Sequence, residues 1–372
     1  MPSSQFEFEI DSQELSSIVT AALNGEIRPD ANYLKQLALI SQHKKNYSQA
    51  AALFSIVLAT DPSVMTELDY AIWHRLIVAQ NGYDLAVQIL EHWHRRNPDF
   101  HWNIWPRHPD TPPADRKRDW FEEKQDEKIA EGLPSIFLNT MHKSGSMTLV
   151  SAFIDMFDLP TCRISLDGAM IDKVVPSWAE HFARGGALTQ EHLPASNENL
   201  DRLEDAGVTK IAVHVRRPEQ AIVSKAFHAE KQAAETENIL FINAAAERAS
   251  PENRQERLER DLEIDLPLRA SWVGDWIRAR EERDGLEIHI STYENLVEDP
   301  TLTIAEIVRF YGLPMRLNMI DLDQYKTERN HFRSGKTEEW RESFTTEQLK
   351  RAQDILHERI PANFLEAAGW AA

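Results

Sequence analysis

The sequence predicts an α/β fold, in which a mostly parallel sheet is flanked by helices, preceded by a smaller all-α domain of helical repeats. Residues 30–98 contain an internal repeat with helical spacing. After residue 134, short β-type runs alternate with helical segments, which is typical of a parallel sheet. A stretch containing several prolines separates the two regions. We therefore expect a helical domain at residues 1–100, a connector at 101–133 and an α/β domain at 134–372.

The N-terminal region repeats itself with an offset of 36 residues. The corresponding positions are Leu34, Tyr47, Ala50, Phe54 and Pro62 in the first copy and Tyr70, Tyr83, Ala86, Leu90 and Pro98 in the second. Two helices per copy, small residues where they cross and a closing proline resemble the tetratricopeptide repeat. Two copies are fewer than the roughly three that stabilise an isolated array. These helices are therefore expected either to dock a protein partner or a second copy of the chain, or only to cap the rest of the protein.

Composition limits the partners and the compartment. The 60 acidic and 41 basic residues give a formal net charge of −19, whereas nucleic acid and anionic membranes attract basic surfaces. The single Cys162 cannot form an internal disulfide. No apolar run approaches the roughly 18–20 residues that span a bilayer, and the first residues are acidic where a signal peptide is basic. These features predict a cytoplasmic protein with neither nucleic acid nor membrane as a partner.

Three strands and five helices are predicted in the α/β domain. The strands are 135–139, 210–215 and 286–291, and the helices are 148–157, 219–229, 267–283, 301–311 and 346–358. Parallel strands place ligands at their carboxyl ends. The charged stretch 230–265 is predicted to be a solvated helical excursion or a lid over the substrate.

The first predicted strand runs into a turn that suits a phosphate group. Lys143, Ser144, Gly145 and Ser146 form this turn before a helix that begins near Thr148. Such a turn directs backbone N–H groups and the positive end of the helix dipole at one point, and the lysine adds a charge. The lysine precedes the glycine, so the Walker pattern of ordinary nucleoside triphosphatases is absent. Taken alone, the turn is also compatible with a plain strand–turn–helix connection.

A second basic segment follows the second strand. Arg216 and Arg217 precede Pro218, which suits the first turn of a helix. Ser224 lies about two helical turns further on. Arginine binds phosphate through two parallel hydrogen bonds, and a serine hydroxyl can donate to the same group. The segment predicts a second anion site, or else a surface arginine pair with a serine that faces the helix.

A third motif places Glu191 and His192 in a loop just before Pro194. A histidine with a pKa near neutrality is a natural general base. A lone histidine is more often a surface or hydrogen-bonded residue, so the sequence is compatible with either interpretation of His192, a general base or a structural residue.

A fourth motif lies near the C-terminus, where Gly335 has Arg333 before it and Lys336 after it. Glycine permits close approach of the backbone to an anion, and the flanking cations attract one. The motif therefore predicts a further anion contact.

Together and in order, the motifs over roughly residues 134–345 resemble the sulfotransferases that use 3′-phosphoadenosine 5′-phosphosulfate (PAPS). HKSGSMT at 142–148 is similar to the family's PKSGTTW loop, which holds the 5′-phosphosulfate. RRPEQAIVS at 216–224 resembles the R[ND]PxDxxVS segment, which holds the 3′-phosphate. The segments 293–314 and 332–340 resemble the YEDL, DP and FLG signature and the RKGxxGDW nucleotide loop.

The resemblance implies a P-loop-type fold and in-line transfer of a sulfuryl group from PAPS to an acceptor hydroxyl on a carbohydrate or small molecule. His192 would be the general base, with Glu191 as its rival, and Lys143 would stabilise charge on the leaving phosphate. No metal is implied. The cofactor-binding residues implied are Lys143, Ser144, Gly145, Ser146, Met147, Thr148, Arg216, Ser224, Tyr293, Arg333, Ser334 and Gly335.

The sequence departs from the family pattern at several positions. His142 replaces the usual proline, and Met147 replaces the second threonine of the loop. Thr148 stands where many members have an aromatic residue, and Ser334 replaces the lysine of RKG. Gln190 occupies the place of a lysine in the small-molecule enzymes. These differences point toward the bacterial and carbohydrate-type members.

Two other functions remain open from the sequence. Another P-loop transferase, such as a kinase, would bind and turn over ATP in preference to the phosphosulfate nucleotide. A scaffold protein that has kept the sulfotransferase fold without its activity would agree with Met147, Ser334 and the N-terminal repeats. The acceptor and the oligomeric state are not encoded in any of the motifs.

Overall fold

The computed structural model describes residues 30–43, 46–65, 117–165, 173–235, 250–316 and 337–371, together with residues 17, 21, 73 and 76. The chain divides into two compact units, Met1–Trp102 and Asn103–Ala372. Part of the predicted connector forms helix α6 (Lys117–Ala130), which belongs to the second unit. No helix of the described ranges is long and apolar enough to cross a membrane.

In the first unit, two helices form the first predicted repeat copy. Helix α2 (Ala31–His43) and helix α3 (Tyr47–Thr60) are followed by the short 3₁₀ helix η1 (Pro62–Val64). The predicted apolar face is buried and consists of Leu34, Leu37, Ala38, Ala50 and Phe54. The second copy lies outside the described residues except for Trp73 and Leu76, so the repeat itself stays a prediction.

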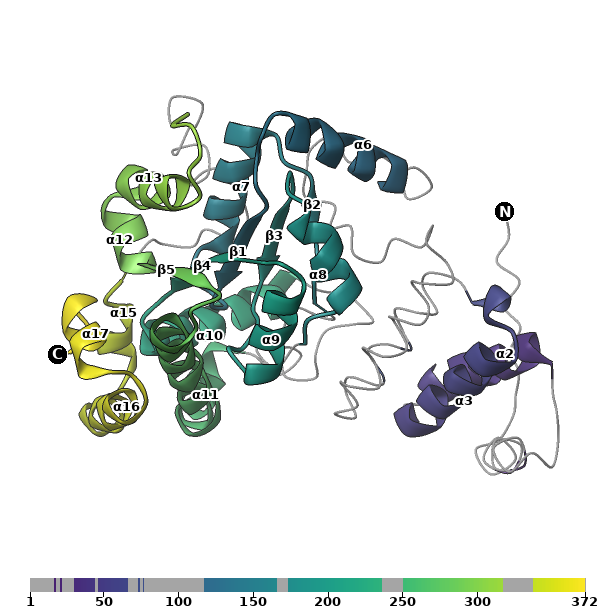
Figure 1. Cartoon of the computed structure of the whole chain (residues 1–372). Helices are drawn as coiled ribbons and strands as arrows, with labels where there is room; N and C mark the ends of the chain where they lie inside the picture. Colours follow the sequence, from purple (N-terminus) through teal and green to yellow (C-terminus); the bar gives the residue numbers. More distant parts are fainter. Residues whose placement is uncertain are drawn as a thin grey trace. The chain divides into compact units, whose positions relative to one another are not determined.

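The second unit contains a five-stranded sheet in which the neighbouring strands are all parallel (Figure 1). The strands are β1 (Ile136–Thr140), β2 (Thr161–Cys162), β3 (Leu188–Glu191), β4 (Lys210–Val215) and β5 (Glu287–Thr292). Their order across the sheet is β2-β3-β1-β4-β5. The predicted α/β fold with a mostly parallel sheet is thereby confirmed, including the three predicted strands, which are β1, β4 and β5.

Strands β2 and β3 were not predicted from the sequence. Both are short, and β3 carries Thr189, Gln190 and Glu191 in place of an apolar run. The predicted loop position of Glu191 is therefore wrong, because this residue is the last of a strand and pairs with Asn139 of β1.

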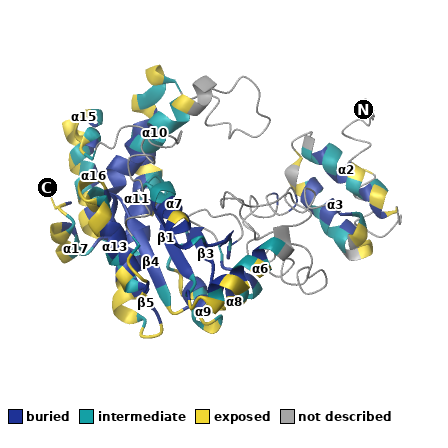
Figure 2. Cartoon of the chain, turned by 90° about the horizontal axis from the view of Figure 1, so that it is seen from above, coloured by how far each residue is buried: buried dark blue, intermediate teal, exposed yellow. Residues whose placement is uncertain are grey.

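Helices cover both faces of the sheet (Figure 2). Beyond α6 they are α7 (Ser146–Phe157), α8 (Pro176–Ala183), α9 (Asn197–Asp205), α10 (Pro218–Glu235), α11 (Arg254–Glu282), α12 (Tyr293–Glu298), α13 (Pro300–Phe310), α15 (Glu339–Ser343), α16 (Thr346–Arg359) and α17 (Ala362–Ala367). Successive strand residues point to opposite faces. In β4, Ile211 and Val213 join the core under α8 to α11 and α16, whereas Ala212 joins the core under α7 and α13.

Helix α11 begins earlier than the sequence indicates. Its predicted start at residue 267 lies inside the helix, which runs through Pro267 from Arg254. The prediction that residues up to 265 are a solvated excursion is wrong for this part, since Leu258 and Leu262 are core residues. The apolar spacing is hard to recognise because charged residues on the same turns are also buried, in ion pairs. Arg257, for example, lies 2.5 Å from Glu230 of α10.

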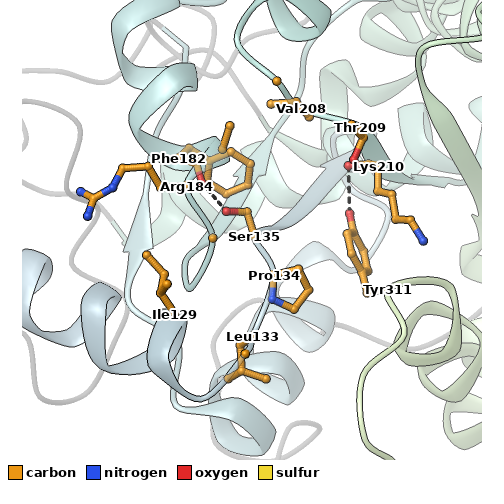
Figure 3. A pocket seen from close by; sticks show the side chains of 14 residues that line it. Ile129, Leu133, Pro134, Ser135, Phe182, Arg184, Val208, Thr209, Lys210 and Tyr311 are labelled. Carbon is orange, nitrogen blue, oxygen red and sulfur yellow. Dashed lines mark hydrogen bonds between the residues drawn. The ribbon is translucent and has the colours of Figure 1, made fainter.

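A pocket of about 370 Å³ lies at the amino edge of the sheet, where β1 and β4 begin (Figure 3). The Tyr311 hydroxyl donates to the carbonyl oxygen of Phe137 at 2.8 Å, and it accepts from the amide of the same residue at 3.0 Å. Ser135 donates to the carbonyl oxygen of Phe182. These polar groups join strands and loops of the scaffold, and the pocket is at the opposite end of the strands from the predicted motifs.

Candidate functional site

The predicted motifs meet at the carboxyl edge of the sheet. The strand register places Asn139 opposite Glu191 and Thr140 opposite His214. The segments that follow β1, β3 and β4 therefore leave the sheet side by side. This brings the glycine turn, the loop histidine and the second basic segment to one place, which is where parallel sheets bind ligands.

The turn between β1 and α7, residues 141–145, has an unusual backbone. Lys143 and Gly145 have φ angles of 70° and 83°, in the left-handed region. A Cβ atom on Gly145 would lie 3.2 Å from the ring of Tyr293. Glycine is therefore required there both by conformation and by space. Helix α7 begins at Ser146, slightly before the predicted start, and the first N–H groups of a helix have no partner within it.

Ser144 is the buried polar residue of this turn. Its carbonyl oxygen lies 2.9 Å from His214 Nε2, and His214 Nδ1 lies 2.8 Å from Ser291 Oγ. A carbonyl oxygen only accepts, so Nε2 carries the proton and Nδ1 accepts from the serine. Burial lowers the pKa of His214 to about 4, which keeps this ring neutral. The Ser144 hydroxyl itself is buried and has no hydrogen-bond partner among the described residues.

The Arg216 guanidinium is the basic group that reaches the turn from the second segment. Its Nη1 donates to the carbonyl oxygen of Lys143 at 2.6 Å. The guanidinium also lies 3.9 Å from the centre of the Tyr293 ring, a cation–π contact. Arg217 points elsewhere and stacks on Trp340 at 3.9 Å. Of the two adjacent arginines, Arg216 is therefore the one placed to act together with the turn.

The other predicted cofactor residues lie on helices or outside the described ranges. Met147 and Thr148 are partly exposed in the first turn of α7, and Ser224 is partly exposed on α10. Residues 333–335 lie outside the described ranges, so the predicted anion contact near the C-terminus stays a prediction.

His192 follows β3 and is held over the end of β1. Its Nδ1 contacts the carbonyl oxygen of Thr140, so this nitrogen carries the proton of the neutral ring. Its Nε2 is then the basic nitrogen, and it lies 3.3 Å from Gln190 Nε2. The Gln190 amide lies closer to Thr140 Oγ1, at 2.8 Å. Burial, the largest effect, lowers the pKa of His192 to about 4.

Glu191 is completely buried and faces away from this arrangement. Its carboxylate accepts from Ser165 Oγ at 2.6 Å, the Ile164 amide at 2.8 Å, Thr189 Oγ1 at 3.0 Å and Arg163 Nη2 at 3.1 Å. With this many donors the carboxylate ties β3 to the segment after β2. A carboxylate so fully engaged is poorly suited to take a proton from an incoming group.

Two residues that the sequence did not reveal hold the His192 loop. The Asn139 side chain accepts from the Leu193 amide at 2.8 Å and donates to the Leu193 carbonyl oxygen at 3.1 Å. Trp276 of α11 donates to the same carbonyl oxygen at 2.9 Å. The one available signal was Asn139 itself, a polar residue that directly follows the apolar residues 136–138 of β1.

His142, which stands where the family pattern has a proline, is a further residue of the site. Its ring stacks on His192 with 3.6 Å between ring centres. Arg269 of α11 donates to the carbonyl oxygen of His142 at 3.0 Å. Within the described part of the chain, no group of three or more His, Cys, Asp or Glu side chains is placed to hold a metal ion.

Comparison with known proteins gives one family. Residues 133–363 match the family model described as the sulfotransferase domain. Among solved structures, mouse sulfotransferase SULT7A1 complexed with PAP is 17% identical, over 67% of this chain and 96% of that chain, with a TM-score of 0.45. Retinol dehydratase in a complex with retinol and PAP is 15% identical, over 65% of this chain and 86% of that chain, with a TM-score of 0.39. No curated protein sequence gives a significant match.

Proposed function

Because the chain belongs to the sulfotransferase domain family, we propose that it transfers a sulfuryl group from PAPS to an acceptor hydroxyl of a carbohydrate or small molecule. The proposal depends chiefly on the buried Ser144 hydroxyl, which has no hydrogen-bond partner among the described residues and lies in a turn that Arg216 also contacts. A buried hydroxyl without a partner costs about 1–3 kcal/mol. A phosphate oxygen at the start of α7 would remove this cost.

The donor nucleotide would be held in two places. Lys143, Ser144, Gly145, Ser146, Met147 and Thr148 would bind the 5′-phosphosulfate, chiefly through backbone N–H groups at the start of α7. Arg216 and Ser224 would bind the 3′-phosphate, with residues 333–335 adding contacts. Tyr293 supports both places, because its ring lies against Gly145 and under the Arg216 guanidinium.

The transfer step uses His192 as the general base. Nε2 takes the proton of the acceptor hydroxyl while the acceptor oxygen forms a bond to sulfur and the bond between sulfur and the leaving phosphate oxygen breaks. The 3.3 Å contact of Gln190 with Nε2 is longer than its 2.8 Å contact with Thr140, so an acceptor hydroxyl displaces the weaker one. Lys143 and the N–H groups of the turn stabilise the charge that develops on the phosphate.

The hydrogen bonds around Glu191 support His192 over Glu191 as the base. Glu191 is fully buried and engaged by donors from the main chain and side chains, whereas His192 is partly exposed and its Nε2 has one long contact, to Gln190. The low pKa of His192 leaves it in the basic form over the whole neutral range.

Binding of adenosine 3′,5′-bisphosphate tests the proposal. At about 100 times its dissociation constant a ligand stabilises a protein by about 2.7 kcal/mol, so the melting temperature should rise by several degrees. The shift should disappear in Lys143→Ala and in Arg216→Ala, and it should persist in Lys350→Ala, a control at an exposed position of α16. A larger shift with ATP than with the bisphosphate would favour a kinase, and no shift with either would contradict nucleotide binding.

A further inference from the structure

Resting on the proposed function, we propose that His142 is a positioning residue of the transfer step. Its ring fixes the plane of His192 and stabilises the imidazolium that forms when His192 takes the acceptor's proton. The two rings come from different strand ends, His142 from the turn after β1 and His192 from the segment after β3. Their ring centres are 3.6 Å apart and the rings are inclined by 30°, which is a stacked contact.

The backbone of His142 is held independently of this stack. Arg269 of α11 donates to its carbonyl oxygen at 3.0 Å, and Asp265 one turn earlier accepts from Arg269 Nε at 2.9 Å. Both side chains of this ion pair are largely buried. The backbone at His142 is therefore held by α11 through a contact that does not involve His192.

The second ring is held in the plane of its own hydrogen bonds. Nδ1 of His192 contacts the Thr140 carbonyl oxygen, and Nε2 lies near the Gln190 amide. These two contacts fix which nitrogen of His192 is basic. They lie in the plane of the ring, so they do not prevent the ring from tilting out of that plane. The face of His142 opposes that tilt, so the lone pair of Nε2 keeps its direction toward the acceptor.

The charges around the pair explain why a neutral ring is needed beside the base. Lys143 from the turn, Lys225 from α10, Arg269 from α11 and Arg163 from the segment after β2 all act on one ring or the other. Glu191 is the acidic residue that acts on His192, and it raises the pKa of that ring. Burial, followed by the charges of His192, Arg269, Lys143 and Lys225, lowers the pKa of His142 to about 2. His142 therefore stays neutral and offers the protonated His192 the electron-rich face of an aromatic ring, an attraction of the cation–π kind.

Two substitutions separate the ring from its charge and hydrogen bonds. His142→Phe keeps a flat ring over His192, whereas His142→Ala removes it. Stacking and cation–π contacts of this kind predict that kcat falls about tenfold in His142→Ala and stays within about threefold in His142→Phe. The KM for the donor should change less than threefold in both, because the backbone that carries the turn is held by Arg269.

Nuclear magnetic resonance of the histidine rings in the full chain tests the stack without relying on activity. The His192 signal is identified by its loss in His192→Asn. In His142→Ala this signal should shift. Two opposite effects then act on its pKa: losing the cation–π attraction lowers it, and losing burial raises it. Burial is the largest cause of the lowered pKa, so the net change should be a rise from about 4 toward the ordinary value. His142→Phe should leave the pKa low, and His357→Ala, at an exposed position on α16, should change nothing.

The outcomes separate the two proposals. An unchanged His192 signal and pKa in His142→Ala would overturn the positioning role, whether or not the protein transfers sulfate. The expected spectra with an equal kcat in His142→Ala would overturn the role in the transfer step. A protein that shows no transfer at all contradicts the proposed function, while the spectra still decide whether His142 positions His192.

Discussion

Ser144→Ala is the perturbation that most sharply separates a binding hydroxyl from a structural one. Ser144 and Ser165 are both completely buried. The Ser165 hydroxyl donates to Glu191 at 2.6 Å, whereas the Ser144 hydroxyl has no hydrogen-bond partner among the described residues. The two serines therefore form a matched pair for the same substitution.

The expected magnitudes follow from these contacts. Removing an unsatisfied buried hydroxyl relieves a cost of about 1–3 kcal/mol, so Ser144→Ala should leave the free energy of unfolding unchanged or raise it. Ser165→Ala removes a hydrogen bond to a charged group and should lower it by about 1.5–3 kcal/mol. For nucleotide binding the order reverses: Ser144→Ala should weaken adenosine 3′,5′-bisphosphate about tenfold, or about 1.4 kcal/mol, and Ser165→Ala should not.

Denaturant unfolding of the ligand-free protein and titration calorimetry with the bisphosphate measure the two effects. A Ser144→Ala protein that is destabilised as much as Ser165→Ala and binds the nucleotide normally would contradict this prediction. That result would mean that the hydroxyl is satisfied inside the protein and takes no part in binding phosphate.

Three further predictions follow from the same geometry. Gly145→Ala should destabilise the second unit by at least about 1 kcal/mol, because the left-handed backbone and the Tyr293 ring at 3.2 Å both oppose a Cβ atom. Thermal unfolding measures this effect, and an unchanged melting temperature would contradict the prediction. Burial lowers the pKa of His214 to about 4, so the unfolded chain binds one more proton between about pH 4 and 6.5, and stability should fall as the pH falls through that window by up to about 1.4 kcal/mol per pH unit. His214→Asn should remove that part of the slope, and an equal slope in both proteins would show that His214 does not titrate this way. Asn139→Ala breaks both bonds to Leu193, so kcat should fall while the affinity for the bisphosphate stays within about threefold; a loss of affinity instead would place Asn139 in the donor site.

Local patterns were sufficient to predict the strands and helices that carry their own apolar residues. β1 and β4 are runs of mostly apolar residues, and β5 alternates apolar Ile288 and Ile290 with polar residues. Helices α7 and α13 present apolar residues with helical spacing, so each of these elements could be recognised alone. β3 could not, because its Thr189, Gln190 and Glu191 are buried through hydrogen bonds. The start of α11 was hidden in the same way by ion pairs such as that of Arg257 with Glu230.

The same distinction between local patterns and long-range packing applies to the residues of the site. The glycine turn, Arg216 and His192 were predicted because each lies within a short motif. The stack of His142 on His192 and the Thr140 contact depend on β1 and β3 being neighbours. That order follows from the packing of the whole sheet, and a single sequence contains no local signal for it.

Sulfuryl transfer with His192 as the base is tested by measuring transfer of labelled sulfate from PAPS to a panel of carbohydrates and small alcohols. The unmutated protein, His192→Asn and Glu191→Gln are compared, each confirmed as folded. General base catalysis contributes about 10²–10⁴-fold. We expect product from the unmutated protein, at least a hundredfold loss in His192→Asn, and retained activity in Glu191→Gln. Activity in His192→Asn together with none in Glu191→Gln would contradict this expectation.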